Sequence, residues 1–300
     1  MEPAHRLRRV QDHPGGQRLT GAARDRQAAR LIGVFDSGIG GLSILQALRA
    51  ELPGEHFIYV ADSGHAPYGE RDAAHVQARA RALTGHLVGR GIEVLVVACN
   101  TATAAAIHLL RAEFPALPII GVEPALKPAV ALSHSARIGV MATRGTLESD
   151  KFKQLLASLQ GQAHFVLQPC DGLALAIERS VQASPETDRE LQACARTHLE
   201  ALGPLGSQQI DTLVLGCTHY PLVAELLQGL AGPAVQLVDT GTPVARQTRL
   251  KLAEVRGLAA QADGPQGQIE LLSTGDAAAL QAAARRWLQA GVTVQPLQLP

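Results

Sequence analysis

The chain has 300 residues, of which 46% are apolar and only 3% aromatic, so Leu, Val and Ala must fill the core of one or two domains. The formal net charge is zero, which provides no basic field for binding nucleic acid. Four cysteines show neither a CxxC pair nor zinc-like spacing, and no apolar signal segment is seen. No apolar run approaches the ~20 residues that cross a membrane. We therefore expect a cytoplasmic protein with reduced thiols.

Residues 1–30 differ in composition from the rest of the chain. They contain seven arginines, three acidic residues and a Pro-Gly-Gly break, with almost no apolar periodicity. Such a segment cannot bury enough apolar surface to fold, so it is predicted to be a disordered N-terminal extension.

From Leu31 onward, short apolar runs alternate with longer helical patterns. The predicted strands are 31–35, 56–61, 93–98, 118–121, 136–141, 163–168, 210–215, 235–238 and 267–272. The predicted helices are 41–50, 72–90, 102–113, 146–160, 187–202, 219–230 and 243–256. Apolar strands covered by helices on both faces are typical of parallel sheets, which predicts an α/β protein.

A weak internal repeat predicts two related α/β units. The stretch "IGVFDSGIGGLSILQAL" from Ile32 recurs in outline as "IGVMATRGTLESDKFKQLL" from Ile138, 106 residues later. The segments around Cys99 and Cys217 recur in step with it, 118 residues apart. We expect one domain over residues 31–121 plus 237–290 and a second over residues 122–236.

Cys99 in "LVVACNTATAA" and Cys217 in "LVLGCTHYPLV" each close a predicted strand and open a predicted helix. Ligands of α/β sheets bind at the carboxyl ends of strands, and helix N-termini stabilise thiolates. Polar neighbours follow both cysteines, which argues against a purely packing role. Cys170 and Cys194 lack such neighbours and are predicted to be packing residues.

Two further polar clusters follow strands. "FDSGIGGLS" places Asp36 and Ser37 before a glycine-rich turn whose backbone amides can approach an anion, either phosphate or carboxylate. "ADSGHAPYGER" places Tyr68 and Gly69 after the second strand. Each cluster alone is weak evidence, since such a glycine turn is as often a tight strand–helix connection. Together with the cysteine segments, they predict a site at the strand ends.

Two thiols from two related units suit one particular chemistry. Removing a proton from one face of a carbon and returning one to the other face requires two acid/base groups on opposite sides. Thiol pKa values can be tuned so that one group is a thiolate while its partner is a thiol. Two alternatives stay open: a thiol-redox pair, whose bonded sulfurs would leave no room for a substrate, and a non-enzymatic anion-binding module.

Four motifs, "GVFDSGIGGLSIL", "YVADSGHAPYGER", "VVACNTATAAAI" and "VLGCTHYPLV", closely resemble those of the glutamate racemases, in the cofactor-independent aspartate/glutamate racemase superfamily. The resemblance covers residues 31 to about 285. It implies two pseudo-symmetric flavodoxin-like domains with the active site in the cleft between them. It also implies interconversion of L- and D-glutamate without pyridoxal phosphate or another cofactor, supplying D-glutamate for peptidoglycan.

The same resemblance implies the roles of individual residues. Cys99 and Cys217 match the two catalytic cysteines, with Cys99 serving the D-enantiomer and Cys217 the L-enantiomer. The residues that match substrate-binding positions are Asp36, Ser37, Tyr68, Gly69, Asn100, Thr101, Thr218 and His219. Asp36 and His219 also match groups that assist the thiols, and Glu178 in "PCDGLALAIE" resembles another assisting carboxylate, beside the alternative of an ordinary helix glutamate.

The resemblance leaves several properties open. An aspartate or broad-specificity amino-acid racemase would use the same cysteines. The expected partner is the small-molecule substrate, with no metal, nucleic acid or membrane. The sequence fixes neither the oligomeric state, for which a homodimer is one candidate, nor activation by a peptidoglycan precursor.

Overall fold

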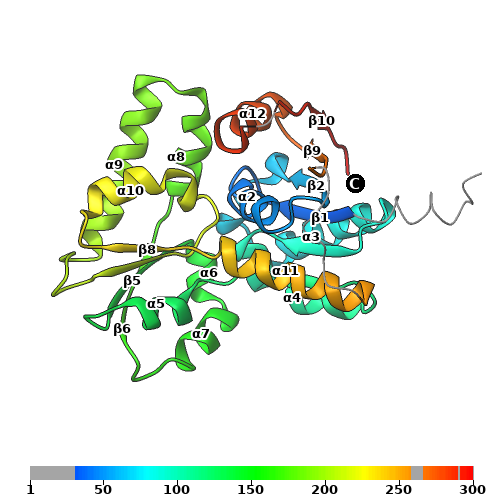
Figure 1. The fold of residues 1–300 in the computed structure, drawn as a ribbon. Helices are drawn as coiled ribbons and strands as arrows, with labels where there is room; N and C mark the ends of the chain where they lie inside the picture. Colours follow the sequence, from blue (N-terminus) through cyan, green and yellow to red (C-terminus); the bar gives the residue numbers. More distant parts are fainter. Residues whose placement is uncertain (1–30, 258–265, 290, 300) are drawn as a thin grey trace, which may run out of the picture.

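The computed structural model describes residues 31–257, 266–289 and 291–299, which form two parallel β-sheets with flanking helices (Figure 1). The extension predicted at residues 1–30 lies outside the described residues. Sheet A has the strand order β10-β9-β2-β1-β3-β4, and sheet B has the order β6-β5-β7-β8. The strands are β1 (Leu31–Asp36), β2 (His56–Ala61), β3 (Val94–Val97), β4 (Ile119–Gly121), β5 (Arg137–Ala142), β6 (His164–Pro169), β7 (Thr212–Leu215), β8 (Gln236–Val238), β9 (Ile269–Ser273) and β10 (Val294–Pro296).

The α-helices are α2 (Leu42–Glu51), α3 (Ala73–Gly89), α4 (Asn100–Glu113), α5 (Leu126–Leu132), α6 (Arg144–Glu148), α7 (Asp150–Ala157), α8 (Leu173–Arg179), α9 (Pro185–Ala201), α10 (Ala224–Ala231), α11 (Gly241–Arg256) and α12 (Ala277–Ala283). A π-helical turn, η5 (Ala284–Leu288), follows α12. The short 3₁₀ helices are η1 (Ser63–His65), η2 (Tyr68–Glu70), η3 (Ser180–Gln182) and η4 (Tyr220–Val223). In the described part of the chain, no helix combines the length and the apolar character that crossing a membrane requires.

The two sheets share one arrangement, which confirms the predicted pair of parallel α/β domains. The order β2-β1-β3-β4 within sheet A is repeated by β6-β5-β7-β8 in sheet B. Strands β9 and β10 extend sheet A beyond β2. Because β8 pairs with β7, the predicted boundary between residues 236 and 237 falls inside a strand of sheet B. We propose that the chain returns to the first domain after Val238.

Alternate residues of each central strand in sheet A enter different cores, as the strand periodicity requires. On one face, Val34 and Val96 pack with α2 and α11 in a cluster that continues without a break to α8, α9 and α10 beside sheet B. On the other face, Phe35 and Val97 pack with α3 and α4. The first of these cores contains residues of both domains and so joins them.

All nine predicted strands are present, but several short elements escaped prediction. Helices α5, α8 and α12 have seven residues each, too few to show a helical period. Strand β10 has three residues. The predicted helix 146–160 is two helices, because Ser149 takes an extended backbone conformation and its side chain accepts the N–H of Phe152 to begin α7.

Candidate active site

A cavity of about 210 Å³ lies where strand ends of the two sheets meet. Both Cys99 and Cys217 line it, one from each domain. The other residues of its wall that the sequence had singled out are Ser37, Tyr68, Gly69, Asn100, Thr101, Glu178, Thr218 and His219. Asp36 is the one predicted site residue outside the wall. It lies behind Ser37 and is fully buried.

Cys99 begins helix α4 directly after strand β3, as predicted. It is the N-cap residue, and its Sγ accepts the backbone N–H of Ala102 at 3.5 Å. Its thiol also contacts the Ser37 Oγ at 3.9 Å. Burial raises the pKa of Cys99 well above its ordinary value, and the neighbouring Asp36 carboxylate adds to the rise. Cys99 therefore favours the neutral thiol when no substrate is bound.

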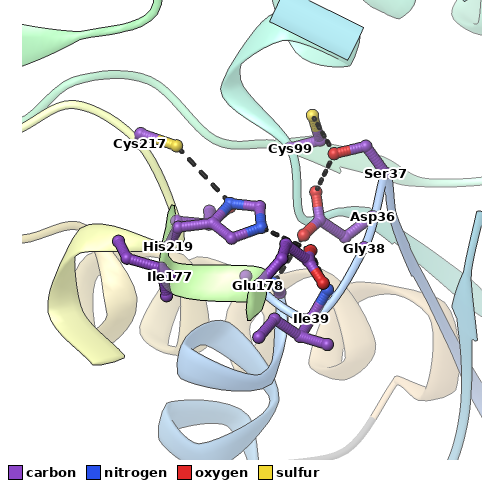
Figure 2. Close-up of polar contacts among 12 residues, drawn as sticks. Asp36, Ser37, Gly38, Ile39, Cys99, Ile177, Glu178, Cys217 and His219 are labelled. Atoms are coloured by element: carbon purple, nitrogen blue, oxygen red, sulfur yellow. Dashed lines mark hydrogen bonds and ion pairs between the residues drawn. The ribbon is translucent and has the colours of Figure 1, made fainter. Parts of the chain in front are cut away.

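Asp36 is held behind this cysteine by the glycine-rich turn after strand β1. One carboxyl oxygen accepts the backbone N–H of Gly41 at 2.6 Å, and the other lies 3.5 Å from the Ser37 Oγ. Burial raises the pKa of Asp36, although the nearby His219 and the backbone N–H groups of Gly41 and Ser37 oppose the rise. Asp36, Ser37 and Cys99 thus form one connected group on the first-domain side of the cavity (Figure 2).

Cys217 has a different setting from the predicted one. It follows strand β7 but precedes a turn and the 3₁₀ helix η4, so it does not open an α-helix. Its Sγ instead lies 3.6 Å from the His219 Nδ1, and the His219 Nε2 lies 2.8 Å from the Glu178 Oε1 (Figure 2). Burial alone would lower the pKa of His219, but the bonds to Cys217 and Glu178 outweigh it and raise the pKa well above its ordinary value. The imidazolium form is favoured, and it stabilises negative charge on the Cys217 sulfur.

The glycine-rich turn does hold an anion, but the anion belongs to the protein. The backbone N–H of Ile39 donates to the Glu178 Oε1 at 2.9 Å, the same oxygen that meets His219. A Cβ atom on Gly38 would lie 2.0 Å from that oxygen, and one on Gly40 would lie 2.4 Å from the His219 Nδ1. Glycines are required here because the turn of the first domain packs directly on side chains of the second.

Some polar groups of the cavity wall are already hydrogen-bonded within the protein, and others are not. Among the described residues, the Asn100 Nδ2 is buried without a hydrogen-bond partner. The backbone carbonyl of Thr218 accepts the Ser43 hydroxyl at 2.8 Å, which fixes this segment across the domain boundary. The Tyr68 hydroxyl donates to the Asp62 carboxylate at 2.5 Å, so the phenol oxygen is used within the protein. Asn100 therefore brings free donor capacity to the wall.

Thr143 and Cys170 are among the wall residues that sequence reasoning did not place in the site. The Thr143 Oγ1 lies 3.0 Å from the Thr101 Oγ1, across the boundary between domains. The internal repeat contained the signal, because Thr143 follows β5 at the place where Ser37 follows β1. Cys170 is buried, as a packing residue would be, and burial raises the pKa of its thiol, which keeps it neutral. Cys194 is half-buried and away from the wall, in keeping with a packing role.

The cavity presents acid/base groups at two places and polar donors between them. All four cysteines are free thiols in the described part of the chain. No group of three or more His, Cys, Asp or Glu side chains in that part is arranged to hold a metal ion. This arrangement can transfer protons to and from a small polar ligand that is held between the two thiols.

Comparisons with known proteins agree on one family. The model of the Asp/Glu/hydantoin racemase family matches residues 40–248. A glutamate racemase of Ectopseudomonas mendocina is 45% identical over 256 residues, which cover 85% of this chain and 94% of the relative. A glutamate racemase of Methylococcus capsulatus is 51% identical over 227 residues, covering 76% and 80% of the two chains.

Solved structures agree with this assignment. The RacE1 glutamate racemase of Bacillus anthracis superposes with a TM-score of 0.77 at 30% identity, covering 90% of this chain and 98% of that one. The Escherichia coli glutamate racemase, solved with L-glutamate and the activator UDP-MurNAc-Ala, gives a TM-score of 0.75 at 29% identity, covering 91% and 99%. With the family model, the sequence relatives and the fold in agreement, the chain belongs to the Asp/Glu/hydantoin racemase family.

Proposed function

We propose that this protein is a glutamate racemase, an isomerase that interconverts L- and D-glutamate by proton transfer between two cysteines without a cofactor. The observation that carries the proposal is the cavity itself, since Cys99 and Cys217 reach it from separate domains. A carbon bound between them can lose a proton to one thiolate and receive one from the opposite thiol. The relatives named glutamate racemase support glutamate as the substrate.

In the direction from L- to D-glutamate, the Cys217 thiolate removes the α-proton and the C–H electron pair stays on the substrate as a planar carbanion. The Cys99 thiol then donates its proton to the opposite face. The turnover leaves Cys217 as the thiol and Cys99 as the thiolate, which is the state that acts on D-glutamate. The raised pKa of Cys99 favours a thiol at that position, and the raised pKa of His219 favours an imidazolium beside Cys217, as this direction requires.

The neighbours of each thiol complete the proposed cycle. His219 exchanges a proton with Cys217, and Glu178 holds the imidazole in line for it. Asp36 and Ser37 take the corresponding positions beside Cys99. Between turnovers these groups return the two sulfurs to their starting protonation by exchange with water.

The polar wall between the cysteines would hold the substrate. We propose that the free Nδ2 of Asn100 donates to a substrate carboxylate. Hydroxyls and backbone groups around Ser37, Thr101 and Thr218, with Gly69 on the first-domain side, would fix the amino acid and stabilise charge that develops on the carbanion. Because the hydroxyl of Tyr68 is bonded to Asp62, its part would be limited to shaping the wall.

A glutamate racemase of this kind would work in the cytoplasm and supply D-glutamate for peptidoglycan, and so for cell-wall biogenesis and cell shape. The resemblance of the four sequence motifs supports this role. Growth of a D-glutamate auxotroph tests it, because expression of this chain should remove the requirement for D-glutamate in the medium.

Replacing either cysteine tests the reaction directly. Cys99→Ser and Cys217→Ser should each abolish racemisation of glutamate, because both directions need both groups. Each variant should still eliminate a leaving group from one enantiomer of a β-substituted analogue, since that reaction needs one base. Near-normal racemisation by either variant would disprove the two-base mechanism. Chiral assays with aspartate and other amino acids distinguish a glutamate-specific enzyme from the alternative, an aspartate or broad-specificity racemase.

A further inference from the structure

One peptide group, between Gly38 and Ile39, is bonded at one end by a buried side chain and at the other by a half-buried one, from different parts of the fold. Its carbonyl oxygen accepts the Tyr59 hydroxyl at 2.6 Å, and its N–H donates to the Glu178 Oε1 at 2.9 Å. Resonance couples the two ends of a peptide group, so donation to the oxygen strengthens the N–H as a donor. The chain of contacts continues from Glu178 through His219 to Cys217.

Tyr59 is placed to do this and is not itself one of the residues that line the cavity. It lies on strand β2, paired with Val34 of β1, and its side chain is fully buried. Its hydroxyl would lie 2.8 Å from a Cβ atom on Gly41, so the phenol is wedged beneath the glycine-rich turn. Burial, reinforced by the nearby carboxylates of Asp36 and Glu178, raises the pKa of the Tyr59 phenol, which keeps it a neutral donor.

We infer that Tyr59 is a positioning residue for the Cys217 half of the site, acting through the Gly38–Ile39 peptide group on Glu178 and His219. The Tyr59 hydroxyl fixes the orientation of that peptide group. The peptide N–H in turn fixes the position of the Glu178 carboxylate, to which the His219 imidazole is bonded. No hydrogen bond of this series reaches Cys99, whose Sγ contacts the Ser37 Oγ and the Ala102 N–H, so Tyr59 acts on Cys99 only through space. Loss of the hydroxyl should therefore affect the two thiols unequally.

The test is Tyr59→Phe, which removes the hydroxyl and keeps the ring. The matched control is Thr84→Val, which removes another fully buried hydroxyl that donates to a backbone carbonyl, inside α3 and away from the cavity. NMR of labelled histidines should show the pKa of His219 falling toward its ordinary value in Tyr59→Phe and unchanged in Thr84→Val. An unchanged His219 titration in a folded Tyr59→Phe protein would overturn the inference.

The kinetic part rests on the proposed function. The kcat from L-glutamate should fall about 10-fold, on the scale of outer hydrogen bonds that orient metal ligands, and the kcat from D-glutamate should fall less. The KM values must change so that the Haldane relation holds. In a Glu178→Gln background, Tyr59→Phe should cause no further loss of kcat, and fully additive losses would contradict action through Glu178.

The positioning role of Tyr59 can be tested independently of the proposed function and of whether Tyr59→Phe folds. If the wild-type protein does not racemise glutamate, the proposed function fails, while the His219 titration still tests the positioning role. If Tyr59→Phe does not fold, the Ile39 amide proton of the wild-type protein provides a second measurement. Its NMR resonance should move strongly upfield in Glu178→Gln, and an unmoved resonance would show that the peptide group is not coupled to Glu178.

Discussion

The two thiols of the cavity differ in their neighbours, although their sequence segments look alike. Cys99 caps a helix and lies beside a hydroxyl and a buried carboxyl group, whereas Cys217 lies beside an imidazole held by Glu178. The sequence predicted both cysteines at strand ends, because apolar runs followed by polar residues mark such positions. It did not predict the geometry of Glu178, which comes from contacts 139 residues apart.

His219→Asn tests the asymmetry between the thiols. Turnover should fall by about 10²- to 10⁴-fold, the usual scale of acid/base assistance, with the larger loss of kcat from L-glutamate, for which Cys217 is the proposed base. The measurement is kcat and KM from each enantiomer on folded variant with product inhibition controlled, since the Haldane relation fixes the ratio of the two kcat/KM values. Small and equal losses of kcat in both directions would assign His219 to packing.

At the scale of elements, the turn between β1 and α2 connects the two halves of the site. It binds Asp36 through the Gly41 N–H and Glu178 through the Ile39 N–H. The glycine pattern was readable from the sequence, and so was its preference for an anion. The sequence did not identify Glu178 as that anion, because α8 is too short to show a helical period and tertiary packing determines how α8 meets the turn.

Gly40→Ala should disturb this turn selectively. The added methyl group would lie 2.4 Å from the His219 Nδ1, so the imidazole or the turn must shift and the contact of His219 with Cys217 is disturbed. We expect a loss of kcat on the order of 10²-fold, which is the loss that misplacing a catalytic group by about 1 Å causes in enzymes. The control is Gly54→Ala, where a methyl group meets no atom within 4 Å. Equal activity of the two variants would show that the close approach has no functional role.

Asp211 joins the end of α5 to strand β7 and makes the fold sensitive to acid. Burial would raise its pKa, but hydrogen bonds from Ser133, Ser135, Thr212 and His134 outweigh burial and lower the pKa to about 2. A carboxyl group whose pKa is lowered by folding stabilises the fold above its unfolded pKa of about 3.9, and this stabilisation is lost as the pH falls toward 2.

Asp211→Asn should therefore lower the free energy of unfolding by about 2 kcal/mol at neutral pH. The difference from the wild-type protein should shrink as the pH falls, because protonation removes the same charge from wild-type Asp211. Urea denaturation of both proteins at pH 7 and pH 3 measures this change. A difference that stays the same at the two pH values would contradict the assigned role.

At the scale of the whole molecule, the site exists only where two similar domains meet. The repeat of strand order places β3 and β7 beside β1 and β5, so their carboxyl ends deliver one cysteine from each sheet. The sequence predicted the strands and the pairing of domains from apolar runs and the repeat. It could not predict the sheet edge at β10 or the core shared between domains, because both depend on packing across distant segments.

Deleting residues 1–28 should leave the fold and basal racemisation largely intact, because their composition lacks a pattern that forms a core. Circular dichroism, thermal unfolding and racemisation rates of the shortened and full-length proteins make the comparison. Loss of folded protein or of catalysis on deletion would show that the segment contributes to the domain.

The most direct measurement of the two-thiol account follows the α-hydrogen of glutamate in deuterated water. Pure protein is incubated with L-glutamate and no added cofactor, and the α-position of each enantiomer is examined early in the reaction. The account predicts D-glutamate carrying deuterium at the α-carbon, while the remaining L-glutamate keeps its protium, because one thiol removes the proton and the solvent-exchanged thiol on the other face returns a deuteron. Formation of D-glutamate that retains the substrate's protium, or no racemisation until a cofactor is added, would contradict it.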